Sequence, residues 1–196
     1  MGEETLDYYE QNSQAYFDET VHVEFGETRR KFTAFLKPGA SILDFGCGSG
    51  RDTLAFLKQG YTVVATDGSE QLCGLASHLT GQSVRHLLFN DLDYIQRFDG
   101  IWACSSILHL PKEELADAFR KMAQALKAGG VVYTSFKYGV FEGIRNGRWF
   151  TDMTWESFSA FNERAGVFSV ADHWLSCDVR PKRGNEQWLN LLLAKR

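Results

Sequence analysis

Several features that would place a protein in a specialised class are missing from this sequence. No apolar run approaches the ~20 residues that a membrane-spanning helix needs. The 4 cysteines show no C-x-x-C spacing, which argues against a zinc site or a disulfide framework and favours reduced thiols. The formal net charge of −4 gives no general support for nucleic-acid binding. These absences predict a cytoplasmic globular protein, with no metal, nucleic acid or membrane among its partners.

The length and the linker composition favour one domain. A chain of 196 residues suits a single large domain better than two. There are only 3 prolines, and no Pro/Ser-rich linker or internal repeat interrupts the chain. The opening segment, MGEETLDYYEQ, is acidic and lacks the apolar core of a signal peptide, which also favours the cytoplasm. The oligomeric state is not indicated.

Helical and extended segments alternate along the chain. Apolar spacing predicts helices at residues 3–19, 24–36, 51–59, 69–79, 112–127 and 154–164, and strands at 41–45, 61–67, 83–89, 98–106, 129–137, 167–179 and 186–194. This alternation predicts an α/β fold with a mostly parallel sheet, whose ligand sites lie at the carboxyl ends of the strands. The last two strands flank a short loop that contains Pro181, so they should pair antiparallel.

The segment ILDFGCGSGRDT places three glycines between a strand and a helix. Gly46, Gly48 and Gly50 follow at alternate positions, so a ligand can approach the bare backbone there. The dinucleotide fingerprint is G-x-G-x-x-G, whereas the spacing here is G-x-G-x-G. Asp44 precedes the loop and disfavours a pyrophosphate, because like charges repel. It favours a ligand that carries an ammonium group.

Polar residues also end the next strands. Asp67 closes the second strand, where nucleoside-binding sheets hold ribose hydroxyls. Asp91 comes just past the third strand, and Ser105 ends the fourth. Because these ends meet at one edge of a parallel sheet, the side chains should converge on one ligand.

With LDFGCGSG, an acid-ended second strand and LKAGGVVYTSF, the chain resembles the class I S-adenosylmethionine-dependent methyltransferases. Its segments are similar to the small bacterial group that includes tellurite- and thiopurine-type enzymes. The resemblance implies a Rossmann-like sheet of seven strands in the order 3-2-1-4-5-7-6, with the last strand antiparallel and helices on both faces. It also implies S-adenosyl-L-methionine as cofactor and methyl transfer to a small molecule.

The resemblance implies a role for each matching position. Residues 1–37 would form a helical lid, 41–136 the cofactor-binding core and 137–196 the acceptor side. The residues expected to contact the cofactor are Tyr16, Arg29, Asp44, Gly46, Cys47, Gly48, Gly50, Asp67, Gly68, Ser69, Asp91, Leu92 and Ser105. Asp44 and the glycine loop would hold the methionine part, Asp67 the ribose, and Asp91 with the Leu92 backbone the adenine.

Arg29 gives a separate indication of an anionic group. It shares one predicted helix face with Phe25, Phe32 and Leu36, so its guanidinium must meet an anion or extend to water. The carboxylate of the cofactor's amino acid is one such anion, and Tyr16 would cover it. A surface ion pair is the alternative.

Methyl transfer from a sulfonium mainly needs orientation and desolvation, and a base only when the acceptor arrives protonated. His109, after the fourth strand, is the one histidine considered as that base, and packing at the start of the next helix is the alternative.

Two late segments should recognise the acceptor. Their cationic and aromatic residues are Lys137, Tyr138, Arg148, Trp149, Phe150, Arg180, Lys182, Arg183 and Trp188. Among these, Lys137, Arg148, Trp149 and Arg180 are the expected acceptor contacts, because arginines beside rings hold small anions. Neither the [D/N]-P-P-[Y/F] motif nor a Pro-Cys pair of nucleic-acid methyltransferases is present. By elimination a small-molecule acceptor is favoured; the arginines favour an anionic one, and a solvated loop with ordinary charges is the alternative.

Two other classes stay open at this stage. A non-catalytic regulator could bind S-adenosylmethionine in the same pocket without transferring the methyl group. An NAD-dependent oxidoreductase could use the same sheet, although Asp44 and the glycine spacing argue against it.

Overall fold

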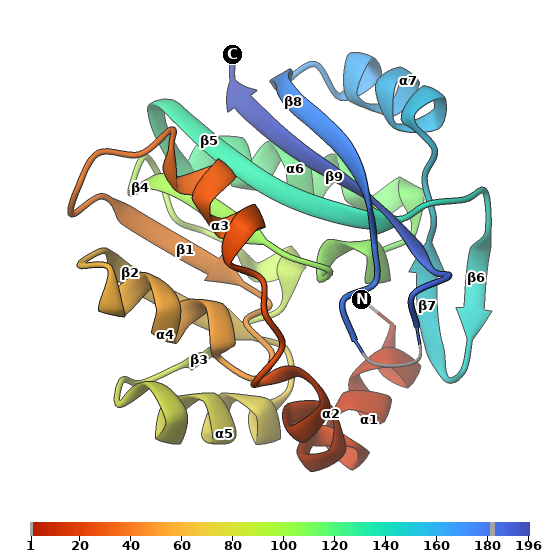
Figure 1. Cartoon of the computed structure of the whole chain (residues 1–196). Helices are drawn as coiled ribbons and strands as arrows, with labels where there is room; N and C mark the ends of the chain where they lie inside the picture. Colours follow the sequence, from red (N-terminus) through yellow and green to blue (C-terminus); the bar gives the residue numbers. More distant parts are fainter. Residues whose placement is uncertain (1, 181–182) are drawn as a thin grey trace.

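The computed structural model describes residues 2–180 and 183–196, so Pro181 and Lys182 lie outside the described residues. One mixed sheet forms the centre of the molecule, in the order β3-β2-β1-β4-β5-β9-β8 (Figure 1). Its strands are β1 (Ser41–Phe45), β2 (Thr62–Asp67), β3 (Arg85–His86), β4 (Phe98–Ala103), β5 (Leu126–Lys137), β8 (Phe168–Cys177) and β9 (Gln187–Lys195). The strands from β3 to β5 are parallel, and β9 runs antiparallel to both β5 and β8. The predicted fold and strand order are therefore confirmed.

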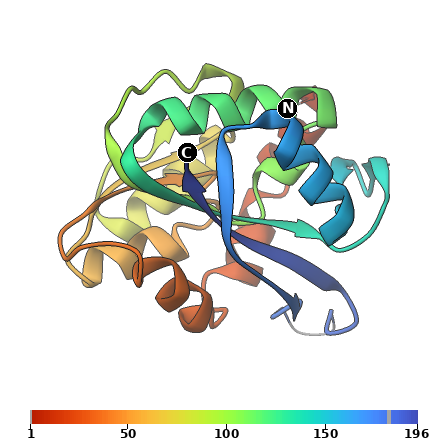
Figure 2. The same cartoon turned by 90° about the horizontal axis from the view of Figure 1, so that it is seen from above.

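Helices cover both faces of the sheet, because neighbouring strand residues point to opposite sides. Ile42 packs with Phe32 and Phe56 on the face of α3 and α4, whereas Leu43 joins Phe119 and Phe158 on the face of α6 and α7 (Figure 2). The helices are α1 (Glu3–Gln11), α2 (Ser13–Thr20), α3 (Gly26–Thr33), α4 (Arg51–Lys58), α5 (Glu70–Thr80), α6 (Lys112–Ala125) and α7 (Trp155–Ala165), with short 3-10 turns η1 (Phe89–Asp91) and η2 (Ile107–His109). This layered core anchors the loops at the carboxyl ends of the strands.

A hairpin replaces part of the loop expected after β5. Strands β6 (Glu142–Arg145) and β7 (Arg148–Thr151) pair antiparallel as a separate two-stranded sheet. Asn146 and Gly147 connect them with φ angles of 52° and 74°, the backbone that a two-residue hairpin turn requires. The Asn-Gly pair was the sequence signal for this hairpin, and the prediction of a loop missed it.

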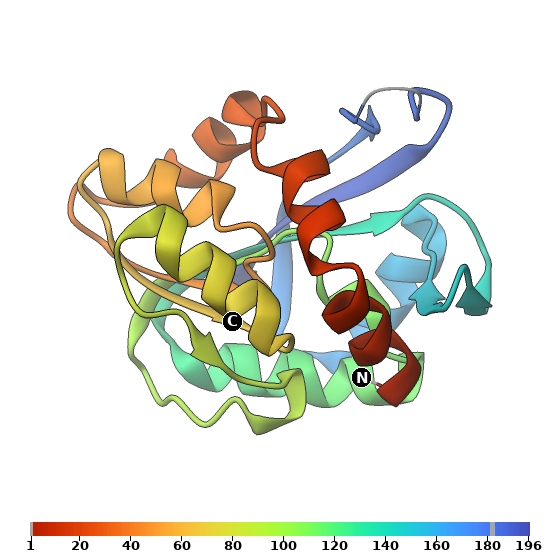
Figure 3. The ribbon, with the colours of Figure 1, turned by 90° about the horizontal axis from the view of Figure 1, so that it is seen from below.

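Other segment bounds differ more modestly from the prediction. The helix expected at residues 3–19 is broken at Asn12 into α1 and α2, and the one expected at 24–36 is shortened to α3. The weak third strand is only two residues long. Seen from below, α1 and α2 lie across the carboxyl ends of the strands, between α5 and β7 (Figure 3).

Candidate functional site

A cavity of about 490 Å³ lies where β1, β4 and β5 end. The glycine loop after β1 forms one wall, and the β6–β7 hairpin with the loop between β8 and β9 forms the opposite one. A smaller space of about 30 Å³ lies beside Asp67 and Gly68, and five residues line both: Tyr9, Tyr16, Gly46, Ser105 and His109. The two spaces therefore share a boundary formed by the N-terminal helices and the ends of β1 and β4.

Tight packing explains the glycines of the loop. Gly46 has φ 84°, and a Cβ there would lie 2.5 Å from the Cβ of Ser106. Gly48 has φ 55°, and a Cβ there would lie 3.0 Å from Cε1 of Tyr16. No larger residue fits either position without displacing a neighbour. The backbone of the loop therefore lies bare at the cavity.

Asp67 organises the same loop from the end of β2. Its carboxylate accepts hydrogen bonds from the backbone N–H of Gly48 at 2.8 Å and of Ser69 at 3.0 Å. Burial raises the pKa of Asp67 in spite of these bonds. Asp67 thus links the glycine loop to the start of α5 and presents a carboxylate to the smaller space.

Asp44 is a buried acid without a cationic partner among the residues that the structure describes. Only 2% of its surface is exposed, and the Thr53 hydroxyl donates to its Oδ2 at 2.5 Å. Burial, with the nearby charge of Asp52, raises the pKa of Asp44 to about 8. An ionised Asp44 would gain from a cation in the cavity, because desolvation and like charge both disfavour its lone negative charge.

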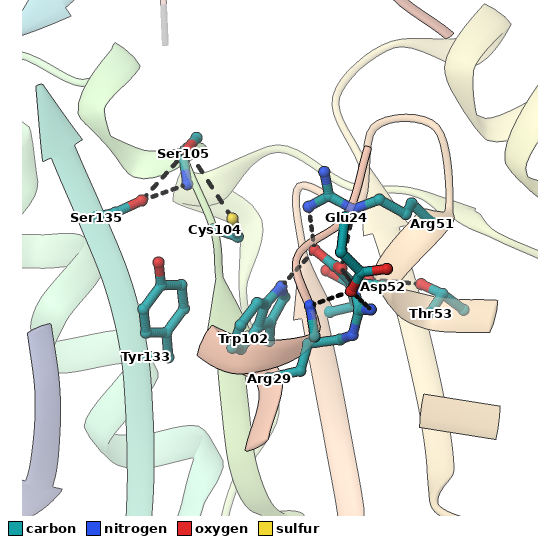
Figure 4. A network of polar contacts seen from close by, with 12 residues as sticks. Glu24, Arg29, Arg51, Asp52, Thr53, Trp102, Cys104, Ser105, Tyr133 and Ser135 are labelled. Carbon is teal, nitrogen blue, oxygen red and sulfur yellow. Dashed lines mark hydrogen bonds and ion pairs between the residues drawn. The ribbon is translucent and has the colours of Figure 1, made fainter. Parts of the chain in front are cut away.

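Asp52 is the centre of a polar network on the first turn of α4 (Figure 4). Arg29 donates to it at 2.6 Å, Arg51 at 2.7 and 3.0 Å, and the Trp102 indole at 3.0 Å. Burial would raise its pKa, but the two arginines hold the pKa of Asp52 below its usual value. The carboxylate of Asp52 is therefore the anion that Arg29 finds in this structure, and Arg51 lies nearer to the cavity.

His109 lines both spaces and is only 4% exposed. Its Nδ1 lies 2.6 Å from the carbonyl oxygen of Trp149, which can only accept, so Nδ1 carries the proton. The Tyr9 hydroxyl lies 2.9 Å from Nε2 and donates to it. Burial lowers the pKa of His109 to about 4, and the charge of Arg148 adds to that shift. The site holds a neutral imidazole whose acceptor nitrogen faces a tyrosine hydroxyl.

Ser105 adopts a strained backbone between the two spaces. Its φ of 52° is uncommon for a residue with a side chain. Ser135 stabilises it by accepting from the Ser105 backbone N–H at 3.0 Å, with the two hydroxyls 3.2 Å apart. Strain of this kind is concentrated at functional sites, where surrounding contacts maintain it.

Cations from the late segments face the cavity, most of them in ion pairs. Lys137 pairs with Glu186, Arg145 with Asp152 at 3.0 Å, and Arg180 with Asp178 at 2.6 Å. Arg148 is buried, and its guanidinium has no carboxylate partner among residues 2–180 and 183–196. Lys182 lies outside the described residues.

The structure brings most of the predicted residues together. Residues that line one or both spaces are Tyr16, Asp44, Gly46, Cys47, Gly48, Asp67, Gly68, Ser105, His109, Lys137, Arg148 and Arg180. Six predicted residues do not line them: Arg29, Gly50, Ser69, Asp91, Leu92 and Trp149. Gly50 and Ser69 are the N-caps of α4 and α5.

The remaining differences have local causes. Asp91 is exposed at the end of η1, whereas Leu92 is buried in the core. Trp149 acts through its backbone, which binds Thr5 and His109. The sequence analysis missed Phe89, which lines the smaller space, and Arg51, which lines the larger one. In the sequence Phe89 ends an apolar stretch typical of a strand, and no sequence pattern distinguishes Arg51 from an ordinary helix residue.

Two classes of site are absent from the described residues. No group of three or more His, Cys, Asp or Glu side chains there could hold a metal ion. Within the same ranges, no helix is long and apolar enough to cross a membrane.

The sequence relatives and solved structures that match this chain include several methyltransferases. A family model described as a methyltransferase domain matches residues 42–130. The chain is 32% identical over 133 residues to an uncharacterized methyltransferase of Geobacillus sp. (strain WCH70). That match covers 65% of this chain, and the chain spans 61% of the relative's length.

Solved structures show the same fold. The structure of 1,6-didemethyltoxoflavin-N1-methyltransferase from Burkholderia thailandensis, with 1,6-didemethyltoxoflavin and S-adenosylhomocysteine bound, superposes with a TM-score of 0.74 at 24% identity, covering 96% of this chain and 84% of that one. A TehB-like S-adenosylmethionine-dependent methyltransferase from Corynebacterium glutamicum gives a TM-score of 0.69 at 22% identity, covering 97% of each chain.

Proposed function

We propose that the chain is a class I S-adenosylmethionine-dependent methyltransferase, with S-adenosylmethionine as cofactor, and that it methylates a small-molecule acceptor. One observation carries the proposal: a single cavity contacts both the glycine loop and the side chains of the late segments. Its volume of about 490 Å³ lies in the range of small-molecule sites. The B. thailandensis neighbour, which holds a small heterocycle, supports this choice.

The residues present fit the cofactor. A Cβ at Gly46 or Gly48 would press on Ser106 or Tyr16, so only glycine keeps the loop backbone bare where it meets the two spaces. Asp44 and Asp67 supply carboxylates for its amino group and its ribose, and Phe89 supplies an apolar surface beside Gly68. When bound, S-adenosylmethionine supplies a methyl group that is already activated for displacement. The chain's own residues need to orient the acceptor and exclude water.

His109 is the proposed proton acceptor. Its neutral ring offers Nε2 to the Tyr9 hydroxyl, and the Tyr9 oxygen in turn faces the cavity. A protonated acceptor would lose its proton to the Tyr9 oxygen while Tyr9 passes its own proton to His109. The Trp149 carbonyl then stabilises the imidazolium through Nδ1.

Residues 1–37 are proposed to include a lid, with 41–136 as the cofactor core and 137–196 as the acceptor side. Helix α1 is held at both walls, because Glu10 accepts from the Glu70 backbone N–H at 2.5 Å and Thr5 from the Trp149 backbone N–H at 2.9 Å. Closure of such a helix would exclude water during transfer. Amide hydrogen exchange in α1 should slow when S-adenosylhomocysteine binds, and equal exchange would contradict the lid.

The acceptor is proposed to be anionic, because cations of the late segments line its side of the cavity. The cytoplasm is the proposed location, since all four cysteines are free thiols.

A transfer assay tests the proposal directly. The purified protein is incubated with S-adenosylmethionine labelled in the methyl group and a panel of small oxyanions, thiols, amines and carboxylates. We expect label transfer to at least one class of acceptor. Binding of S-adenosylhomocysteine without transfer to any member would favour a cofactor-binding regulator. A thermal midpoint raised by NAD but not by S-adenosylhomocysteine would favour an oxidoreductase.

A further inference from the structure

Six cations line the larger cavity, and they differ in whether a carboxylate neutralises them. Four of them form ion pairs with acidic residues: Arg51 with Asp52, Lys137 with Glu186, Arg145 with Asp152 and Arg180 with Asp178. The other two, Arg148 and Arg183, form no ion pair within residues 2–180 and 183–196. The charge available to a ligand is therefore much smaller than the number of cations indicates.

Arg148 is the more unusual of these two. It is 8% exposed, whereas Arg183 is half-buried in the loop between β8 and β9. The Nε of Arg148 is buried without any hydrogen-bond partner, and its Nη1 donates to the Tyr9 hydroxyl only at a long distance of 3.4 Å. A buried guanidinium without a carboxylate is costly, because its charge has lost water and gained no counter-ion.

Aromatic rings hold Arg148 in place without neutralising it. Its guanidinium carbon lies 4.2 Å from the ring centre of Tyr8, 5.2 Å from that of Phe150 and 5.7 Å from that of Tyr9. Cation–π contacts orient a guanidinium and contribute modest stability, but they leave its charge and its N–H donors available. Neighbouring His109 is neutral, so it adds no second charge.

We infer that Arg148, the one buried cation of the described cavity lining without a carboxylate partner, binds the anionic group of the acceptor, a small molecule with a carboxylate, phosphate or similar oxyanion. The inference rests on the proposed function and narrows it. Arg180, the other arginine expected to contact the acceptor, donates from both Nε and Nη2 to Asp178, at 3.0 and 2.6 Å, so its fork is already occupied. A second, separated anionic group could meet only the half-buried Arg183 among the cavity cations that form no ion pair within the described residues.

The test compares anionic and neutral probes of one shape. Benzoate, benzamide and inorganic phosphate are titrated by calorimetry into the protein saturated with S-adenosylhomocysteine. The variants are Arg148→Met, Arg148→Lys and Arg164→Met, the last an exposed arginine on α7 that removes the same charge away from the cavity. Met keeps the apolar packing on Tyr8 but removes the charge.

We expect benzoate to bind the wild type about tenfold or more tightly than benzamide, because a hydrogen bond to a charged group stabilises a complex by about that factor or more. Phosphate should compete with benzoate. Arg148→Met should abolish the preference, Arg148→Lys should restore only part of it because lysine lacks the planar fork, and Arg164→Met should keep it. The thermal midpoint of Arg148→Met without ligands should equal or exceed that of the wild type, since an uncompensated buried charge is removed.

Three results would overturn the inference: equal binding of benzoate and benzamide by the wild type, an anion preference that survives in Arg148→Met, or a lower midpoint with unchanged anion binding. Loss of the preference in Arg183→Met instead would assign the seat to that residue. Failure of S-adenosylhomocysteine to bind the wild type would contradict the proposed function. In that case benzoate and benzamide, titrated without S-adenosylhomocysteine, would still decide whether Arg148 binds an anion.

Discussion

The two walls of the cavity are built in different ways. The cofactor wall comes mainly from one stretch, residues 44–69, which contributes backbone N–H groups, glycines, the buried acid Asp44 and the partly buried acid Asp67. The acceptor wall comes from segments far apart in the chain, and its charges are mostly paired with one another. One wall therefore offers acids that have no cationic partner among the described residues, and the other offers the buried cation Arg148, whose Nε has no hydrogen-bond partner. The contrast suits a cationic cofactor facing an anionic acceptor.

A side chain added to the glycine loop should have the largest effect on cofactor binding. In Gly48→Val, the side chain would occupy space beside the ring of Tyr16, at a position whose φ of 55° a branched residue resists. Binding of S-adenosylhomocysteine, measured by calorimetry, should be lost. Gly60→Val is the matched control, because Gly60 has φ 85° with open space around it. Normal binding by a folded Gly48→Val variant would show that the loop is only a turn.

Removal of the proposed base should act on turnover and spare cofactor binding. In His109→Asn, kcat for a protonated acceptor should fall by about 100-fold, a usual contribution of general base catalysis, with unchanged affinity for S-adenosylhomocysteine. An equal loss of cofactor affinity would instead indicate a packing role.

The pH dependence of kcat/KM and of stability also tests the role of His109. The pKa of His109 is lowered to about 4, so the ring stays neutral well below pH 6.5 and any acid limb that it causes in kcat/KM should lie near pH 4. The unfolded chain takes up this proton at higher pH than the folded one. The stability due to neutral His109 is therefore present above pH 6.5 and is lost as the pH falls towards 4. Thermal midpoints of wild type and His109→Asn across that window measure this loss.

Loss of the ribose-side acid should have an intermediate effect. Asp67→Ala should weaken cofactor binding by about 1–3 kcal/mol, because hydrogen bonds to a charged group disappear and the loop loses the bond from Gly48. Asp99→Ala is the control, since Asp99 binds Ser41 and Lys127 and lines neither space. Unchanged affinity in a folded Asp67→Ala variant would exclude the ribose role.

The smallest expected effect is a pH dependence of cofactor affinity. The pKa of Asp44 is raised to about 8, so the free protein holds it mostly protonated at pH 7. A bound ammonium group would favour its ionised form, and affinity should rise between pH 6 and 8 by up to about tenfold per pH unit if one proton is released on binding. Because the pKa of folded Asp44 is raised, its protonated form stabilises the fold at low pH, and that contribution is lost as the pH rises through 8. Calorimetry in buffers of different ionisation enthalpy counts the protons. Asp44→Asn should show no such dependence.

The sequence predicted the two walls to different degrees. Gly46, Gly48, Asp44 and Asp67 were predicted from their positions at or just after the end of a strand whose apolar pattern is clear, and all four line the two spaces. The β6–β7 hairpin was missed although its Asn-Gly turn was visible, because its strands are short and carry few apolar residues. Arg29 was correctly expected to need an anion, but its pairing with Asp52 depends on how α3 packs against α4.

The sequence by itself determined the sheet, its antiparallel last strand and the position of the cofactor loop. These depend on periodicity and on backbone conformations that only glycine adopts easily, and both are local properties. Tertiary structure decided which charges remain free. Arg148 and Arg180 look alike in the sequence. In the structure the guanidinium of Arg180 donates two hydrogen bonds to Asp178. Within the described residues, the guanidinium of Arg148 contacts aromatic rings and a tyrosine hydroxyl instead. An ion pair depends on distances of a few ångströms between segments far apart in the chain, and only the packed fold sets those distances.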